Sequence, residues 1–178
     1  MLAGLSLIAA AVLLGAPAGA EEAGPSNTAA PRSGYVWPIP GDPPVIGRRF
    51  DPPPEPWSAG HRGVDLVGRE GSPVRAAGPG TIHFAGPVAG RGVVSIEHPG
   101  GLLTTYEPLE PTVAEGQSVR AGDVIGRLSP GHHGCPARAC LHWGLRRAGD
   151  VYLDPLSLLG MTRVRLLPLH DRPSSEPG

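Results

Sequence analysis

Short runs of alternating apolar and polar residues, separated by Gly and Pro, fill the chain between residues 63 and 128. Alternation with period two is typical of β-strands that bury one face, and the Gly and Pro breaks are typical of turns. The pattern predicts strands at Val45–Phe50, Gly63–Val67, Val74–Ala77, Gly80–Ala85, Gly92–His98, Leu102–Tyr106 and Val124–Leu128. Many short strands with such turns indicate a mostly-β protein, an antiparallel sandwich or barrel. The 27 Gly and 23 Pro leave no room for a long helix.

Two further segments carry different signals. Residues 51–60 are rich in Pro and are predicted to be a loop that leads directly into His61 and shapes one wall of a cleft. Near the end of this region, Asp154-Pro155 is followed by Gly160. Asp is a favourable N-cap, Pro fits the first helical position and Gly commonly follows a helix end, so one or two helical turns are expected.

The N-terminus is predicted to be a signal peptide over residues 1–20. An apolar run through Leu14 is followed by Ala18-Gly19-Ala20, which is typical of a cleavage site. The alternative is an uncleaved anchor, but the run is short for the ~20 residues that span a bilayer. Residues 21–34 are predicted to be a flexible leader, 35–160 one domain and 161–178 a C-terminal tail. We therefore expect a secreted, extracellular monomer with no membrane span once the signal is removed.

The composition excludes several classes of function. The net charge is −1 and aromatic side chains are few (2 Phe, 3 Trp, 3 Tyr), so neither electrostatics nor base stacking favours nucleic acid as a partner. All 15 basic residues are Arg, which excludes Schiff-base chemistry and lysine-linked prosthetic groups.

The chain has two cysteines, Cys135 and Cys140. An even number of Cys in a secreted chain favours a disulfide, and the intervening segment is short but closable. The alternatives are a zinc-bound thiolate at Cys140 and two free thiols.

Candidate metal ligands come from two predicted strands. In the stretch H-R-G-V-D, alternation places His61 and Asp65 on one face and Arg62 on the opposite, apolar face. In the stretch C-L-H-W-G, Cys140 and His142 share the polar face. Two imidazoles and one carboxylate are a typical ligand set for catalytic zinc, with a fourth position left for water. The alternative is an ordinary polar cluster.

These motifs resemble a known family. H-x-G-x-D at His61 matches the motif of the LytM-like (lysostaphin-type, M23) zinc metallopeptidases, and C-L-H at Cys140 resembles that family's H-x-H strand. The resemblance extends over about residues 35 to 160 and implies the LytM-like fold. It implies one zinc ion held by His61, Asp65 and His142. It also implies peptidoglycan peptides as partner and a cell-wall location.

Two positions depart from the family pattern. The family's two other histidines act on the water or the transition state, and the matching positions are Cys140 and Pro108. The catalytic residues are therefore unassigned. His132 and His133 lie in the loop before the Cys pair and either one could swing over the zinc, although we favour a solvated loop pair. Glu107 is another candidate base, but alternation predicts that it faces away from position 108.

Two functions follow from these observations. The first is a secreted zinc endopeptidase acting on peptidoglycan peptides, with activity weak or lost. The alternative is a catalytically degenerate module that binds the cell wall or regulates another wall hydrolase. Residues 113–126 resemble a pattern shared with biotinyl and lipoyl carrier barrels, but a carrier needs a Lys that this chain lacks.

Overall fold

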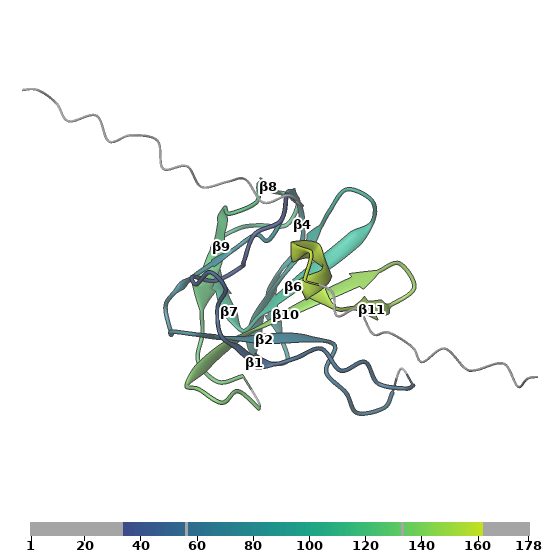
Figure 1. Ribbon diagram of the computed structural model, residues 1–178. Coiled ribbons are helices and arrows are strands. Elements are labelled where there is room, and N and C mark those ends of the chain that lie inside the picture. The colour runs from purple at the N-terminus through teal and green to yellow at the C-terminus, as the bar shows by residue number, and fades with distance from the viewer. Residues whose placement is uncertain (1–33, 56, 133, 162–178) are drawn as a thin grey trace, which may run out of the picture.

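The computed structural model describes residues 34–55, 57–132 and 134–161, and within them the strands form two antiparallel sheets (Figure 1). Across the larger sheet the strands are β1 (Ile46–Arg48), β2 (Gly63–Gly68), β10 (Ala139–Arg147), β6 (Leu102–Glu107), β5 (Arg91–Glu97), β4 (Gly80–Val88) and β8 (Ser118–Val119). A further strand, β11 (Val151–Leu153), pairs with β10. The smaller sheet consists of β3 (Pro73–Arg75), β9 (Val124–Leu128) and β7 (Leu109–Pro111). In Figure 1, β7 and β9 stand to the left of β6 and β10.

The mostly-β, antiparallel prediction is confirmed. Every predicted strand overlaps an observed one, whereas β7, β8 and β11 were not predicted because two or three residues carry no readable alternation. The predicted helical turn is the 3₁₀ helix η1 (Pro155–Leu159). Asp154 caps it by accepting the Leu156 N–H at 3.0 Å, and Gly160 ends it with a φ of 72°.

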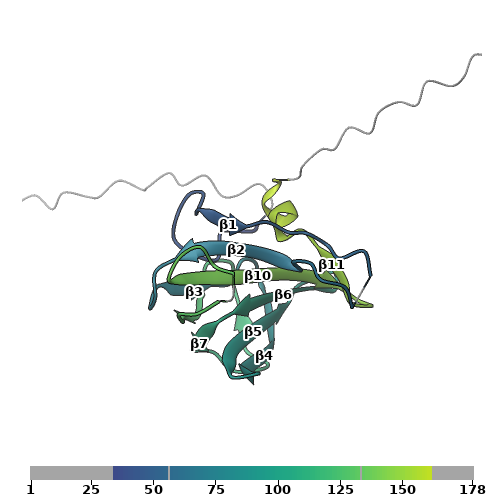
Figure 2. The ribbon, with the colours of Figure 1, turned by 90° about the horizontal axis from the view of Figure 1, so that it is seen from below.

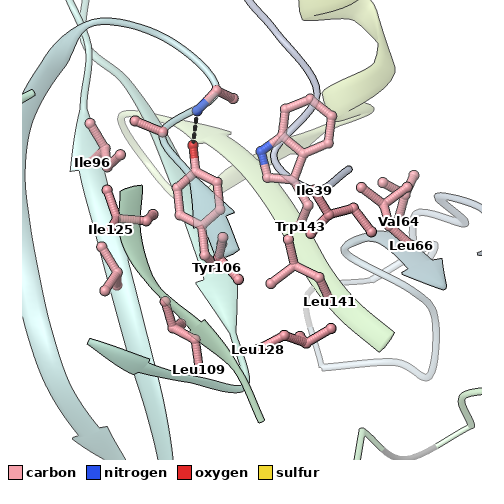
Figure 3. Close-up of a cluster of buried hydrophobic side chains, with 14 of the residues drawn as sticks. Ile39, Val64, Leu66, Ile96, Tyr106, Leu109, Ile125, Leu128, Leu141 and Trp143 are labelled. Atoms are coloured by element: carbon pink, nitrogen blue, oxygen red, sulfur yellow. Dashed lines mark hydrogen bonds between the residues drawn. The ribbon is translucent and has the colours of Figure 1, made fainter. Parts of the chain in front are cut away.

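Apolar side chains from both sheets fill the space between them (Figure 3). Trp143 and Leu141 from β10 and Tyr106 from β6 meet Leu109 from β7 and Ile125 from β9, all with at most 1% of their surface exposed. Burying a large apolar side chain stabilises a fold by about 1.5–3 kcal/mol. This burial fixes which face of β10 and β6 points inward, so the intervening residues must point away from the core.

A chain of buried polar groups crosses the same core. The Tyr106 hydroxyl accepts the Ala77 N–H at 2.9 Å, as the dashed line in Figure 3 shows, and shares a 2.9 Å hydrogen bond with Thr104. His98 contacts Thr104 Oγ1 through Nε2 and the Pro79 carbonyl through Nδ1, both at 2.7 Å. Burial lowers the pKa of His98, although the Pro79 hydrogen bond acts in the opposite direction. His98 is therefore a structural residue.

Within the described residues, no helix is long and apolar enough to cross a membrane. The predicted signal peptide, nearly all of the leader and nearly all of the tail lie outside these residues.

Candidate metal centre

Strands β2 and β10 lie side by side in the larger sheet, with β1 on the other side of β2 and β6 on the other side of β10 (Figure 2). Asp65 of β2 is paired directly with His142 of β10. Directly opposed residues of antiparallel strands share a face, so both side chains point the same way. Their neighbours Val64 and Trp143 are fully buried in the core. The predicted alternation of these two strands is therefore confirmed.

His61 precedes β2 and is fixed by the proline-rich loop. Its main chain pairs with Asp51, with N–H to carbonyl distances of 2.7 and 2.9 Å in the two directions. This bridge closes residues 51–61 into a loop and brings the imidazole of His61 over Asp65. The loop therefore shapes the site, as the sequence predicts.

Four side chains converge on one point. The Asp65 Oδ1 atom lies 2.9 Å from His61 Nε2, 2.9 Å from His142 Nδ1 and 3.0 Å from His132 Nε2. His61 Nε2 and His142 Nδ1 are 3.1 Å apart. One ligand atom from each of the four residues lies within 4.8 Å of every other.

The hydrogen-bonding of His61 shows which nitrogen is free for a metal. Its Nδ1 donates to the carbonyl oxygen of Arg49 at 2.7 Å, so a neutral His61 carries its proton there and presents a lone pair on Nε2. Nε2 lies 2.9 Å from the Asp65 carboxylate oxygen, so this contact is favourable when either a proton or a metal cation is shared between the two atoms. An orienting bond from one imidazole nitrogen to a main-chain carbonyl is typical of metal-ligating histidines.

Asp65 is the most buried member of the cluster. It has no exposed surface, and no described residue hydrogen-bonds its Oδ2 atom. Burial acts to raise the pKa of Asp65, but hydrogen bonds from His132, His142 and His61 outweigh it and hold the pKa well below its usual range. The site therefore contains a buried anion, and a buried charge requires a partner of opposite charge or a metal.

The spacing of the cluster fits a tetrahedral ion. With zinc-to-nitrogen bonds of about 2.0–2.1 Å, ligand atoms at the corners of a tetrahedron lie about 3.3 Å apart. The contacts of 2.9–3.1 Å in the cluster are close to this value. Imidazole and carboxylate are also donors that zinc prefers, so the residues present fit the metal that the motif implies.

The position of His132 corrects the sequence-based interpretation. A solvated loop histidine was expected, but only 16% of the His132 side chain is exposed and its Nε2 contacts the Asp65 carboxylate. His133 lies outside the described residues. His132 lies in a loop, so strand alternation could not predict which way its side chain points. The only available signal was the nearby Cys pair, which forces the loop back towards His142.

The predicted disulfide is present between Cys135 and Cys140, with Cα atoms 5.8 Å apart. A zinc-bound thiolate at Cys140 and two free thiols are thereby excluded. Cys140 is fully buried on β10, two residues before His142. The sulfur that occupies the family's histidine position is consequently locked in a covalent bond and cannot carry a proton.

One glycine, Gly63, leaves room for the imidazole of His142. Gly63 and Gly144 are paired on β2 and β10. A Cβ atom on Gly63 would lie 2.5 Å from the Trp143 carbonyl oxygen and 2.7 Å from His142 Nε2, closer than real Cβ contacts. The glycine of the H-x-G-x-D motif is therefore required for the ring of His142 to lie against β2.

A groove of about 580 Å³ opens beside the cluster. It is lined by Gly60, His61, Arg62, Arg91, Thr105, Glu107, His142, Gly144, Leu145, Arg146 and Tyr152. The prediction that Arg62 shares the apolar face is wrong, because this residue precedes β2 and its guanidinium lies 5.5 Å from the centre of the Tyr152 ring. The groove thus combines two cluster histidines with three arginines.

Glu107 lies on the cluster side of the sheet. It is paired directly with His142, lines the same groove, and accepts a 2.7 Å bond from Arg91 Nε. Pro108 lines a different hollow, with Pro130 and other residues of the next loop. The side chains of Glu107 and Pro108 thus line different hollows, which agrees with the prediction that they point in opposite directions. Glu107 is the one that faces the cluster.

The comparisons with known proteins agree with these features. Residues 59–155 match the model of Peptidase family M23. An uncharacterized protein of Mycobacterium tuberculosis is 54% identical over 136 residues, which are 75% of this chain and 54% of that protein. The DD-carboxypeptidase/endopeptidase Mpg of Neisseria meningitidis (strain ATCC 13091 / M2091) is 34% identical over 114 residues, 64% of this chain and 26% of Mpg. The chain thus spans about half of the mycobacterial relative and about a quarter of Mpg.

A solved structure shares the fold. The catalytic domain of lysostaphin, an antimicrobial peptidase from Staphylococcus simulans, superposes with a TM-score of 0.57 at 25% identity. The match covers 66% of this chain and 92% of that domain. The family model covers more than half of the 178 residues, and the predicted resemblance is confirmed. The chain belongs to peptidase family M23, as a member that departs from the family pattern at positions 108 and 140.

Proposed function

We propose that His61, Asp65 and His142 hold one zinc ion and that the chain acts on bacterial peptidoglycan peptides, with endopeptidase activity that is weak or lost. The observation that carries this proposal is the convergence of two imidazoles on the buried Asp65 carboxylate beside an arginine-lined groove. Membership of the M23 family supports the substrate class. Mpg is named a DD-carboxypeptidase/endopeptidase, and lysostaphin is an antimicrobial peptidase.

The groove supports a peptide ligand that carries carboxylates. Arg guanidinium groups match carboxylates with two parallel hydrogen bonds, and three Arg side chains line this groove. Arg91 forms an ion pair with Glu107, and Arg146 forms one with Asp150. A peptide lying along β6 and β10 would pass directly over His142.

A zinc ion held by His61, Asp65 and His142 would supply Lewis acidity to a scissile carbonyl and would lower the pKa of a bound water to about 7. The chain itself must move the proton and stabilise the oxyanion. Pro108 has no polar side chain and Cys140 is in a disulfide, so neither can do this. Loss of a general base costs about 10²–10⁴ in rate and loss of an oxyanion donor about 10²–10³. Hydrolysis is therefore expected to be slow.

Any remaining activity would depend on Glu107. It is the carboxylate of the groove, it is paired directly with His142, and 17% of its side chain is exposed. A carboxylate beside a metal-bound water could accept a proton, and the bond to Arg91 holds the Glu107 side chain in the groove.

The alternative function is a catalytically degenerate module that binds the cell wall or regulates another wall hydrolase. The position of His132 favours it, because a third imidazole in the cluster occupies space that a water would need. In either case we propose that the chain is secreted. The predicted signal and the disulfide, a bond that persists in oxidising compartments, support this.

The test combines metal analysis with two assays on purified peptidoglycan, sedimentation for binding and release of soluble peptides for cleavage. We expect about one zinc per chain, binding to the polymer, and little or no release. His142→Ala should lose the metal. Rapid release that disappears in Glu107→Gln would show an active endopeptidase with a replaced base. Absence of zinc and of polymer binding would refute the proposal.

A further inference from the structure

We infer that His132 is the fourth protein ligand of the metal, so that the site is a closed centre of three imidazoles and one carboxylate. The inference rests on the proposed zinc site and adds to it the identity of the fourth ligand. The family motif by itself supplies three ligands and leaves the fourth coordination position open for water. With His132 as the fourth ligand, the zinc would be structural.

The first argument is distance. His132 Nε2 lies 3.0 Å from Asp65 Oδ1, whereas the two histidines of the family motif lie 2.9 Å from the same atom. A residue that only exchanged protons with a zinc-bound water would be one water layer farther from the carboxylate. His132 instead lies about as far from the carboxylate oxygen as His61 and His142 do, and all four ligand atoms lie within 4.8 Å of one another.

The second argument is the anchoring of the loop that carries His132. The Cys135–Cys140 disulfide ties this loop to β10. The His132 carbonyl accepts the Cys135 N–H at 3.2 Å, and Gly131 donates to the Arg138 carbonyl at 3.4 Å. At the other end of the loop, Ser129 donates to the Pro108 carbonyl at 3.1 Å. These bonds hold the main chain of Gly131 and the carbonyl of His132, which lowers the entropy lost when the His132 side chain becomes a ligand.

The third argument is burial and charge. Only 16% of the His132 side chain and 14% of the His142 side chain are exposed. Of the two positive charges on zinc, the single carboxylate would balance one, and imidazoles would supply the other three bonds. A zinc ion with four protein ligands has no position for a substrate carbonyl or a nucleophilic water. The closed centre explains why the chain can retain the metal cluster after both catalytic positions of the family are lost.

The experiment compares wild type with His132→Ala in the full chain. Each protein is loaded with zinc for chelator competition and with cobalt(II) for visible absorption, with and without azide as a small-anion probe. His83→Ala is the matched control, because His83 is a β4 histidine outside the cluster with 54% of its side chain exposed.

We expect His132→Ala to lower zinc affinity by at least about 10-fold, since removing a residue that merely orients a ligand costs about 10- to 100-fold. Addition of azide should leave the cobalt(II) spectrum of wild type and of His83→Ala unchanged. It should change the spectrum of His132→Ala, where a coordination position is open to the anion. Unchanged zinc affinity in His132→Ala, or a wild-type spectrum that already responds to azide, would overturn the inference.

X-ray absorption at the zinc edge of wild type needs no variant and decides the matter even if His132→Ala does not fold. Three imidazoles around zinc are expected. Two imidazoles would overturn the assignment of His132 and leave the zinc site of the proposed function intact. Absence of bound zinc would overturn both.

Discussion

Replacing Gly63 by Ala is the sharpest test of how the sheet shapes the metal centre. The new methyl group would lie 2.5 Å from the carbonyl oxygen of Trp143 and 2.7 Å from Nε2 of His142. The first contact is with main chain of the neighbouring strand, which cannot move without breaking the β2–β10 ladder. The second is with the ring whose opposite nitrogen, Nδ1, faces Asp65.

The expected size follows from these contacts. Overpacking a tight site costs about 1–3 kcal/mol. Restricting the unfolded chain by a Gly-to-Ala change offsets about 0.4–1 kcal/mol of that. Gly63→Ala should therefore lower the free energy of unfolding of the metal-free chain by about 1–2 kcal/mol. In the presence of zinc the loss should be larger, because a displaced His142 weakens a ligand that binds only the folded state.

The pairing of the two strands provides a matched control. Gly144 is the register partner of Gly63, but a Cβ atom there would meet its nearest neighbour, the Arg62 carbonyl oxygen, at 3.6 Å, an ordinary contact. Gly144→Ala should thus be neutral or stabilising by up to about 1 kcal/mol and should keep its zinc.

The assay is urea denaturation of both variants, with zinc and with chelator, together with chelator competition for zinc. We expect Gly63→Ala to bind zinc at least about 10-fold more weakly than wild type, by analogy with the loss of a residue that orients a ligand. Gly144→Ala should bind zinc as tightly as wild type. If Gly63→Ala matches Gly144→Ala in both stability and zinc affinity, the contact between His142 and β2 does not set the geometry of the site.

Four further outcomes are expected. Intact-mass measurement without reductant should find the chain two daltons lighter than its reduced form, and uptake of two alkyl groups would contradict the Cys135–Cys140 bond. Pro108→His with Cys140→His and Cys135→Ser should raise any measurable peptide release from peptidoglycan; an unchanged rate would mean that the loop, not the missing imidazoles, limits hydrolysis. Tyr106→Phe should lower the free energy of unfolding by about 1–3 kcal/mol in urea, because a buried main-chain N–H loses its acceptor. Since the pKa of His98 is lowered in the folded state, stability should fall as pH drops below its unfolded value of about 6.5, and denaturation at pH 7.5 and 5.5 should show a smaller fall in His98→Gln.

Much of the fold was readable because burial imposes alternation. Val64 and Trp143 are fully buried, so the opposite faces of β2 and β10 could be assigned and Asp65 and His142 placed together in advance. Short edge strands gave no such signal. β8 has two residues, and β7 ends in a proline that cannot donate to a ladder, so neither stands out from a loop.

The failure at Arg62 has a different cause. Alternation applies only within a strand, and β2 begins at Gly63, the residue after Arg62. Arg62 follows the loop rather than the sheet and turns to the groove, where it stacks on Tyr152. A polar residue directly before a strand is thus poorly placed by periodicity, even where the strand itself is predicted correctly.

The three unusual features of this chain form one local rearrangement. The cysteine that replaces a family histidine at position 140 forms the disulfide that anchors the loop, and the carbonyl of Pro108, at the other altered position, accepts a hydrogen bond from Ser129 in that loop. Between these two anchors lies His132, 3.0 Å from the buried carboxylate. Separate loss of the two catalytic histidines would not explain why a third imidazole lies beside Asp65. The closed metal centre proposed above would give a reason, because the disulfide that removes one proton-transfer position also anchors the loop that carries His132.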